Sequence, residues 1–482
     1  FGSAQDRLVE GSKGFHPLRL GVGRSPAILQ GARRLPGEMT ESYFDWTAKL
    51  FDRRRISGKP EALKGVRVLD LSLIIFGPAT ADYLGELGAE VIRVEMPGGG
   101  DIMRIVAPEG QFWKNVSPAF FAQNHSKYHV GIDLHKPEGQ DLVRRLAAKS
   151  DIVVENYRGG TLERKWGIGY RQLREINPRL IYVANTGFGQ WGPFIRRASY
   201  DGLAQAVSGF TAASGFPGRP PLKMGIYIGD YFGACLSALG VLAALHYRDR
   251  TGQGQFLEVS QCEALLRAMD WTWVYAGLTG KNRSQHGNRD PSVSPSGIYP
   301  CRDGFVALVA GSDDEFRGLC RAMGREDLLA DPRFATRAAR AEETHAETLD
   351  KQIGAWVWGM TRVEVEATGR EHRFAVAAVA TAKDHYEDPH LRARGSVWET
   401  EDPVYGNMVE HGPAPKLSET PMRYKWAAKP VGFHNEYVFG RLLGLGTDQI
   451  EELERQRVIG KWADRKGPKP PDDWAPGKGE IL

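Results

Sequence analysis

Short apolar runs alternate with stretches of helical character from residue 66 onward. Residues 66–71, VRVLDL, form a compact run of the length and β-branched composition typical of a buried strand. A helical pattern follows over 79–87 and ends at Gly88, a residue suited to a helix C-cap. Residues 89–95, AEVIRVE, predict a second strand. This strand–helix–strand unit has the length expected of a parallel crossover.

The same alternation continues further along the chain. Helical patterns begin near residue 137 and cover 170–176, and strands are predicted over 151–155 and 180–184. Strands that alternate with helices favour a doubly wound α/β domain with a parallel sheet. In such domains ligands bind near the carboxyl ends of the strands.

The pattern changes after residue 225. Residues 226–230, IYIGD, read as a buried β run that turns directly into an apolar helix over 231–247. A β-hairpin is predicted from 297 to 309, around an Arg-Asp-Gly turn, and residues 315–370 are mostly helical. The mixed pattern from about 290 to 395 indicates a second, smaller α+β domain.

Composition restricts the classes of function. Hydrophobic residues make up 41% of the chain and charged residues 25%, the mix of a soluble globular protein. No stretch approaches the roughly 20 uninterrupted apolar residues that cross a bilayer, so no membrane partner is expected. The formal charge of +4 is small for 482 residues. Because the basic residues are scattered among acidic ones, no nucleic-acid partner is expected.

The cysteines indicate a reducing compartment. The four of them lie far apart and form no C-x-x-C pair. Such spacing suits neither a zinc site nor a disulfide framework, so all four are predicted to be reduced. The opening residues carry no signal-peptide pattern, and the cytoplasm is the expected location.

Asp230 is the residue that stands out chemically. It lies between an apolar run and an apolar helix, where free backbone N–H groups and the helix dipole favour an ionised carboxylate. An ordinary helix cap would have the same position. Small neighbours, Gly229, Gly233 and Ala234, allow a bulky ligand to approach the backbone closely.

Asp201 is the second candidate carboxylate. It follows a long glycine-containing loop and precedes an apparent helix, so it too has a capping role as the alternative interpretation. Two carboxylates at similar junctions would converge on one crevice of a parallel sheet.

Several familiar motifs are missing from the sequence. Residues 98–100 are three glycines that do not open a helix in a G-x-G-x-x-G pattern, so a nicotinamide cofactor is not indicated. No Walker-type lysine motif and no G-x-S-x-G elbow is present. His125 and His129 lack the glutamate of an H-E-x-x-H motif, so no metal site is predicted.

From Gly65 to about Gly460 the chain resembles the class III CoA-transferases, the CaiB/BaiF-like family. The motifs that carry the resemblance occur in order: GVRVLDLSLIIFGPATADYLGELGAEVIRVEMPGGGD, NHSKYHVGIDLHKPEGQ, DIVVENYRGGTLERKWGIGY, NPRLIYVANTGFGQWGP, YDGLAQAVSGF and IGDYFGACLSALGVLAALHYRDRTGQGQFLEVS. Each is common alone, but the ordered set is specific.

The resemblance implies an α/β fold with a Rossmann-like large domain, a smaller α+β domain, and two chains threaded through each other as an interlocked dimer. It implies four segments: an N-terminal extension over 1–60, a CoA-binding large domain over 61–285, a small domain over 286–395, and a C-terminal segment over 396–482 that returns to the large domain and ends in a tail. The partner is expected to be a second copy or a related subunit.

The resemblance also implies roles for particular residues. The family's nucleophilic aspartate matches Asp230 in the Gly229-Asp230 step, and Asp201 matches an acidic residue that assists it. Residues expected to contact coenzyme A are Ile75, Phe76, His135, Lys136, Asn156, Tyr157, Arg164 and Gly229. No tightly bound cofactor is expected, because the coenzyme A thioester is a substrate.

The implied reaction moves coenzyme A from an acyl-CoA thioester to a carboxylic acid through an aspartyl anhydride and an aspartyl-CoA thioester. Alternatives on the same scaffold are an acyl-CoA racemase, an intramolecular CoA isomerase, and a non-catalytic CoA-binding subunit of a heteromer. Racemases of the family have a histidine where this chain has Tyr200, and tyrosine, with a reference pKa near about 10, is a poor base at neutral pH. Where transferases of small diacids carry a glutamine and a glycine-rich lid, this chain has Ile75 and residues 288–291, NRDP, so the smallest acceptor acids are not expected.

Overall fold

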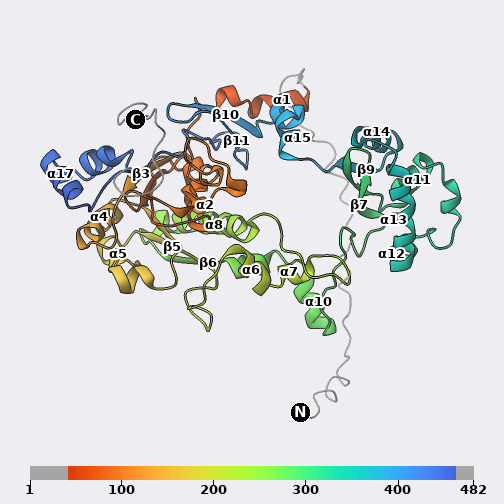
Figure 1. Cartoon of the computed structure of the whole chain (residues 1–482), viewed down its shortest axis with the longest axis horizontal. Helices are drawn as coiled ribbons and strands as arrows, with labels where there is room; N and C mark the ends of the chain where they lie inside the picture. Colours follow the sequence, from red (N-terminus) through yellow and green to blue (C-terminus); the bar gives the residue numbers. More distant parts are fainter. Residues whose placement is uncertain (1–41, 463–482) are drawn as a thin grey trace, which may run out of the picture. The chain divides into compact units, whose positions relative to one another are not determined.

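The computed structural model describes residues 42–462 (Figure 1). The chain divides into two compact units, residues 1–50 and 51–482. In the first unit the described helix is α1, Tyr43–Leu50, which has no buried residue. The predicted extension up to residue 41 and the tail from 463 lie outside the described residues.

A six-stranded parallel sheet forms the centre of the second unit. Its strands are β1 (Arg67–Asp70), β2 (Glu90–Glu95), β3 (Lys127–Gly131), β4 (Ile152–Glu155), β5 (Ile181–Thr186) and β6 (Phe256–Ser260). They lie in the order β3-β2-β1-β4-β5-β6, and every neighbouring pair is parallel. Strand order therefore reverses between β1 and β4, the position where open α/β sheets leave a crevice at their carboxyl edge.

Helices cover both faces of this sheet. Side chains of α2 (Phe76–Glu86) and α8 (Ile228–Thr251) pack on one face in a cluster that includes Val68. On the other face, α4 (Pro137–Ala148) and α5 (Tyr170–Ile176) pack around Leu69 together with the C-terminal segment. Burial on both faces explains why the strands read as continuous apolar runs.

A second, three-stranded antiparallel sheet has a core of its own. It consists of β7 (Ser296–Cys301), β8 (Gly304–Val309) and β9 (Ala375–Ala378), covered by α11 (Asp313–Ala322), α13 (Glu343–Val357) and α14 (Arg362–His372) (teal in Figure 1). The predicted hairpin is therefore confirmed, as is a mixed α/β fold with a large parallel and a smaller antiparallel sheet.

The remaining elements are short. A hairpin of β10 (Val397–Asp402) and β11 (Gly406–His411) was not predicted. The other α-helices of the described residues are α3 (Pro118–Phe121), α6 (Asp201–Val207), α7 (Phe210–Ala213), α9 (Gln261–Arg267), α10 (Thr272–Thr279), α12 (Arg337–Ala341), α15 (Ala382–Glu387), α16 (Pro389–Ala393) and α17 (Thr447–Arg455). π-Helical turns cover Leu162–Trp166 and Glu436–Leu442, and short 3-10 turns cover Arg53–Arg55, Ile102–Arg104, Pro108–Gly110 and Glu326–Leu329.

The prediction of a buried β run at 226–230 is wrong. Ile226 and Tyr227 are 59% and 46% exposed, and α8 begins at Ile228. Without a partner strand, the apolar run before the helix has no ladder to join. Asp230 therefore lies in the first helical turn and does not follow a strand.

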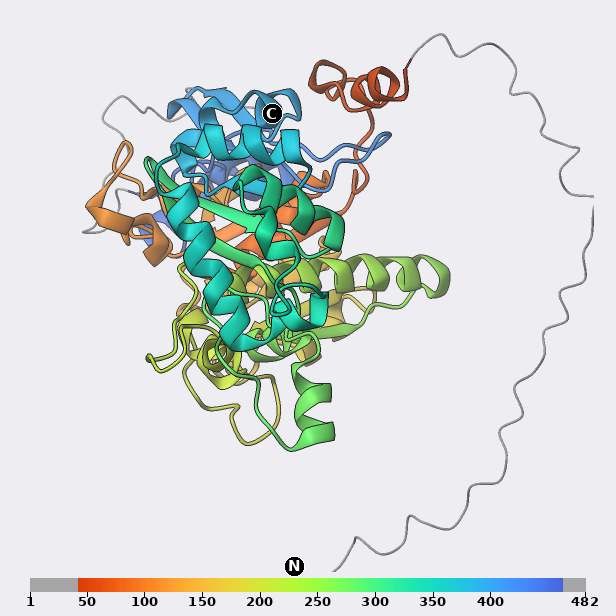
Figure 2. The ribbon, with the colours of Figure 1, turned by 90° about the vertical axis from the view of Figure 1, so that its right-hand side faces the viewer.

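Helix α8 is 24 residues long, and Figure 2 shows it along its length. By length and composition alone it would be able to cross a membrane, yet half of its apolar window is buried inside the protein. The apolar composition of α8 therefore matches a helix packed into the protein core. All four cysteines are free thiols, as predicted.

Candidate active site

Asp230 lies in the first turn of α8 with only 6% of its surface exposed. The first turn of a helix has backbone N–H groups without intrahelical partners, and the helix dipole is positive there. The position combines burial, which penalises a charged carboxylate, with a local field that favours it.

Gln261 orients the Asp230 carboxylate. It is the first residue of α9, directly after β6, and its Nε2 donates to Asp230 Oδ1 at 2.6 Å. Its Oε1 accepts a hydrogen bond from Ser199 Oγ at 3.0 Å. With Oδ1 held in this way, Oδ2 of Asp230 has no hydrogen-bond partner among the described residues.

Asp201 lies beside this pair and opens α6, with 3% of its surface exposed. Its Oδ1 accepts from the backbone N–H of Gly229 at 2.7 Å, and its Oδ2 accepts from Gln205 Nε2 at 2.6 Å. Gln205 Oε1 in turn accepts from the Met224 N–H at 2.9 Å. Asp201 therefore fixes the start of α8 against α6.

The electrostatics of the pair favour a proton on Asp230. Burial and, after it, the negative charge of Asp201 raise the pKa of Asp230, the hydrogen bond from Gln261 lowers it, and the net result is a pKa of about 7. A carboxylate that titrates near neutral pH fits covalent and general-base chemistry.

Two glycines set how closely α8 approaches its neighbours. A Cβ at Gly229 would lie 3.0 Å from Asp201 Oδ1, and one at Gly233 would lie 2.7 Å from the ring of Phe76. The space expected to admit a ligand at Gly233 is therefore filled by Phe76. The N–H of Gly229 is likewise already bonded to Asp201.

The loop between β1 and α2 lies at the reversal of strand order. Asn156, just after β4, accepts from the Leu73 N–H at 2.7 Å and donates to the Leu73 carbonyl at 2.6 Å. Ile74 has φ of 70°, a conformation that is strained for a β-branched residue. Strained backbone conformations of this kind cluster at functional sites. The predicted residues Ile75 and Phe76 follow at once, and each is 3% exposed.

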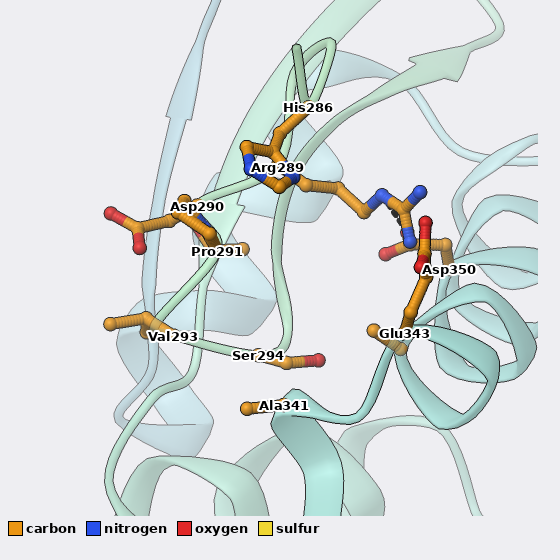
Figure 3. Close-up of a pocket in the computed structure, with 11 residues that line it drawn as sticks. His286, Arg289, Asp290, Pro291, Val293, Ser294, Ala341, Glu343 and Asp350 are labelled. Atoms are coloured by element: carbon orange, nitrogen blue, oxygen red, sulfur yellow. Dashed lines mark ion pairs between the residues drawn. The ribbon is translucent and has the colours of Figure 1, made fainter. Parts of the chain in front are cut away.

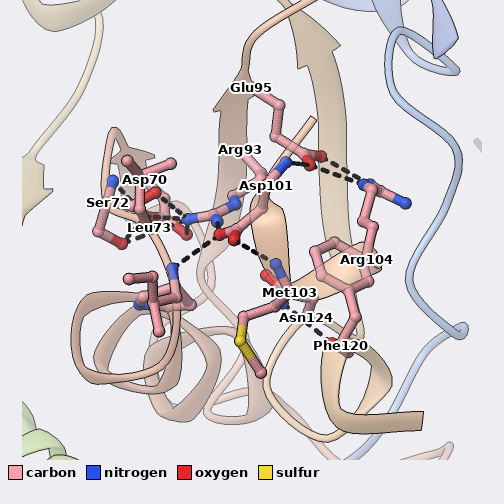
Figure 4. A network of polar contacts seen from close by, with 12 residues as sticks. Asp70, Ser72, Leu73, Arg93, Glu95, Asp101, Met103, Arg104, Phe120 and Asn124 are labelled. Atoms are coloured by element: carbon pink, nitrogen blue, oxygen red, sulfur yellow. Dashed lines mark hydrogen bonds and ion pairs between the residues drawn. The ribbon is translucent and has the colours of Figure 1, made fainter. Parts of the chain in front are cut away.

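A buried ionic network holds this loop (Figure 4). The guanidinium of Arg93 lies between Asp70, at 3.0 Å, and Asp101, at 2.5 Å, and it also donates to the Ser72 carbonyl at 2.6 Å. Asp101 Oδ2 accepts from the N–H of Ile74 at 2.8 Å. The strained backbone is therefore tied to charges that have no exposure to solvent.

The other predicted CoA contacts divide into two sets. His135 and Tyr157 meet through Trp166, with ring centroids 5.5 and 5.4 Å from that indole, and the His135 side chain is 56% exposed. Lys136 Nζ donates to the Gln456 carbonyl, and Arg164 donates to backbone carbonyls of its own turn at 3.0 and 3.2 Å. None of these residues has a hydrogen bond or ion pair with Asp230 among residues 42–462.

The NRDP segment lies against α13, one of the helices that cover the three-stranded sheet (Figure 3). Arg289 faces Glu347 at 3.5 Å and Asp350 at 3.7 Å, both on α13. The segment lines a cavity of about 100 Å³. These ion pairs anchor it to a helix, in contrast to the free backbone of a glycine-rich lid.

Gln261, Gln205 and Ser199 were missed as site residues. Gln261 directly follows a strand that the sequence did predict, so the rule that ligands gather at strand carboxyl ends would have identified it. Gln205 lies one helical turn after Asp201, a spacing that places the two side chains on one face. Ser199 has no comparable signal, because an irregular loop brings it to Gln261.

Comparison with known proteins identifies one family, both by sequence and by structure. A sequence profile of CoA-transferase family III matches residues 63–435. Succinyl-CoA–D-citramalate CoA-transferase of Chloroflexus aurantiacus is 41% identical over 401 residues, which cover 83% of this chain and 98% of that protein. The alpha subunit of succinyl-CoA–L-malate CoA-transferase from Chloroflexus aurantiacus is 34% identical, covering 82% of this chain and 92% of its own. A crystal structure of a CaiB/BaiF family protein from Brucella suis has a TM-score of 0.72 at 29% identity, over 80% of this chain and 100% of that one.

Proposed function

The chain belongs to CoA-transferase family III and is a CoA-transferase, and from this premise we propose that Asp230 is its covalent carboxylate. The observation that carries the proposal is a buried carboxylate with one oxygen held by Gln261 and the other left without a partner. The free oxygen, Oδ2, is the atom that attacks.

The proposed reaction has four steps. Asp230 Oδ2 attacks the thioester carbonyl of the donor, which forms an aspartyl acyl anhydride and expels the CoA thiolate. The thiolate attacks the aspartyl carbonyl of the anhydride, giving an aspartyl-CoA thioester and the free donor acid. The acceptor carboxylate then attacks this thioester and expels the thiolate again. Finally the thiolate takes the new acyl group and regenerates the Asp230 carboxylate.

Exclusion of water is essential because the anhydride hydrolyses. The 6% exposure of Asp230 supports a protected position, and closure of a loop over the bound ester completes it. Asp201 acts as a positioning residue, since it holds the start of α8 through Gly229 and, after burial, contributes to the raised pKa of Asp230.

We propose succinyl-CoA as donor and a hydroxylated dicarboxylic acid as acceptor. The names of the two relatives at 41% and 34% identity combine succinyl-CoA with citramalate and with malate. The thioester would bind as a substrate along the crevice between β1 and β4, with contacts from the loop after β1 and from Asn156 and Tyr157. His135, Lys136 and Arg164 would contact its polar end.

We infer that the large domain is Rossmann-like, because its strand order matches that of doubly wound nucleotide-binding sheets. We also infer an interlocked dimer. One of the relatives is named as an alpha subunit, so the second chain is either another copy or a related subunit. Light scattering on the purified chain distinguishes the two: a dimer supports self-association, and a monomer that gains mass only with a second gene product supports a heteromer.

The decisive test is to trap the intermediate. The protein is incubated with succinyl-CoA, quenched with hydroxylamine, and digested for mass spectrometry. A donor-dependent hydroxamate at Asp230 is expected, with none in Asp230→Ala. Asp249→Ala, a change at an exposed position on the same helix, should keep full labelling.

Other outcomes would replace the proposal. If esters bind, Asp230 stays unmodified and substrate protons exchange with solvent, the chain is a racemase. If esters bind without labelling or exchange, it is a binding subunit.

A further inference from the structure

Four ionisable side chains from three separate segments meet beneath the β10–β11 hairpin. Asp82 and Glu86 lie one turn apart on α2, His125 precedes β3, and Glu410 lies on β11. Their side chains are 2%, 3%, 1% and 13% exposed, in that order. None of them takes part in the proposed transfer.

His125 is the centre of the group. Its Nδ1 lies 2.6 Å from Asp82 Oδ1, while its Nε2 faces Glu410 Oε2 at 3.5 Å and Glu86 Oε1 at 3.9 Å. These last two separations are too long for good hydrogen bonds. His125 Nε2 therefore has no hydrogen-bond partner although it is completely buried, and Glu410 Oε1 has none either. Buried polar atoms without partners are rare and call for an explanation.

The separations of His125 Nε2 from Glu86 and Glu410 are near those between metal ligands. A second grouping shares two of these residues, since one ligand atom each from Asp82, Glu86 and His125 lie within 4.8 Å of one another. Ligands about 2.1 Å from a tetrahedral Zn²⁺ lie about 3.4 Å apart, close to the two separations from His125 Nε2. A carboxylate on the other ring nitrogen, as Asp82 provides, orients a metal-bound imidazole.

We propose that His125 Nε2, Glu86 and Glu410 bind a divalent transition-metal ion, best matched by Zn²⁺, with Asp82 as the residue that positions the imidazole. An imidazole among the ligands favours a transition metal over Ca²⁺ or Mg²⁺, which prefer oxygen alone.

The local charge balance supports a cation. Three buried carboxyl groups surround one imidazole, and the nearby Lys127 ammonium is already used by Asp70, Asn124 and the Pro78 carbonyl. Burial of carboxylates without a counter-charge is unfavourable, and a bound dication would supply that counter-charge. The ring of Tyr424 stacks on His125 with centroids 3.8 Å apart and separates the group from solvent.

The ion would link α2, the segment before β3 and the β10–β11 hairpin, which are far apart in sequence. Its role is therefore structural, and its loss is expected to loosen the hairpin without removing Asp230. The sequence predicted no metal site because His125 and His129 were considered as a histidine pair and lack the glutamate of an H-E-x-x-H motif. The structure places His129 in a different network, against Glu95 at 2.8 Å.

The test uses the full chain without a histidine tag. It is stripped with chelator, given equimolar Zn²⁺, passed through a desalting column, and measured by elemental mass spectrometry and thermal melting. About one retained equivalent and a higher melting temperature are expected, because a ligand that binds the folded state stabilises it. His125→Asn and Glu410→Gln should each weaken binding by about tenfold or more, as should Asp82→Asn.

The controls are His385→Asn, which changes an exposed histidine on α15, and Glu401→Gln, which changes an exposed glutamate on β10. Both should retain the metal and its stabilising effect. Glu410→Gln alters a position near the surface, so it tests the proposal even if His125→Asn does not fold. Retention below about 0.1 equivalent with an unchanged melting temperature would overturn the proposal, since a folded zinc site binds tightly. Equal retention in wild type and Glu410→Gln would also overturn it, as adventitious binding.

Discussion

Burial and a neighbouring carboxylate act in the same direction on Asp230, and both raise its pKa, to about 7. Its nucleophilic form is the ionised one. We therefore expect kcat/KM to fall as pH drops below 7 and to level off above it, because kcat/KM follows the free enzyme. A pH profile between 5 and 9 measures this midpoint.

Two variants test the cause of that midpoint. Asp201→Asn removes the charge that raises the pKa, so the midpoint should move to lower pH. Gln261→Leu removes the hydrogen bond that lowers the pKa, so the midpoint should move up. Asp249→Asn should leave it unchanged. A midpoint that stays the same in both active-site variants would mean that another group controls the profile.

Glu155 provides a second prediction at the scale of a residue. It is fully buried, burial raises its pKa to about 8, and its carboxyl accepts the Tyr157 N–H at 2.6 Å. In the unfolded chain it titrates near about 4.3. The folded state therefore binds a proton that the unfolded state has lost between those values, and stability falls as pH rises through this window.

Glu155→Gln keeps an acceptor for Tyr157 and removes the ionisation. At pH 4.5 the variant and the wild type should have nearly equal free energies of unfolding. At pH 8 the variant should be more stable than the wild type by roughly 2–4 kcal/mol, because only the wild type loses stability on ionisation. Melting temperatures measured across this range test it, with the exposed Glu138→Gln as control. Parallel curves for Glu155→Gln and wild type would contradict it.

At this scale the sequence predicted that Asp230 and Asp201 lie near each other, from a pair of strand-to-helix junctions. The two residues do lie close together, but Asp230 follows no strand, and the hydrogen bond from the Gly229 N–H to Asp201 joins them. The sequence could not reveal the left-handed backbone of Ile74, since isoleucine is among the residues least suited to it. Contacts with Asp101 impose that conformation from 27 residues away.

At the scale of elements, the loop between β1 and α2 depends on the buried ionic network. Asp101→Ala would remove the acceptor for the Ile74 N–H and leave Arg93 without one of its two carboxylates. Breaking a buried pair costs about 3–5 kcal/mol, so the melting temperature should fall steeply. The freed loop should also weaken acyl-CoA binding.

Asp101→Asn separates the two effects, because it keeps an acceptor oxygen for Ile74 and loses only the charge. It should be destabilised while acyl-CoA affinity, measured by calorimetry, falls less than in the alanine variant. Asp52→Ala breaks a surface ion pair with Arg54 away from this loop and should leave acyl-CoA affinity unchanged. Equal affinity in all three proteins would mean that the loop does not contact the ester.

The elements of the large sheet were predictable because they are buried on both faces and read as apolar runs. The β10–β11 hairpin was missed for the opposite reason. Its strands, VWETED and GNMVEH, are rich in acidic and polar residues, and their pairing depends on the turn between them. The apolar run at 226–230 was misassigned because hydrophobicity alone does not reveal whether a neighbouring strand exists.

At the scale of the whole molecule, the two compact units imply that the first is dispensable for folding. The family match begins at residue 63, and α1 has no buried residue. A chain that begins at residue 51 should keep the melting temperature within about 2 °C and retain transferase activity, since surface changes away from core features cost little. A loss of activity with unchanged melting would assign a catalytic or assembly role to residues 1–50.

The overall class was predictable from the alternation of strands and helices, and the family from ordered motifs. The strand order depends on which helices cross which face, and this is settled by packing between Val68 and α8 on one side and Leu69 and α4 on the other. Such long-range packing leaves no local signature in the sequence.

The close contact between Gly233 and Phe76 limits how this enzyme can evolve. A side chain at 233 would begin 2.7 Å from the ring, whereas one at Gly225 would meet nothing within 4 Å. In a library of single substitutions under selection for activity, position 233 should be depleted of nearly every change and position 225 should accept many. Diversification of substrate range by point mutation is therefore expected to arise in the loops that face α8 and to leave the small residues of the helix unchanged.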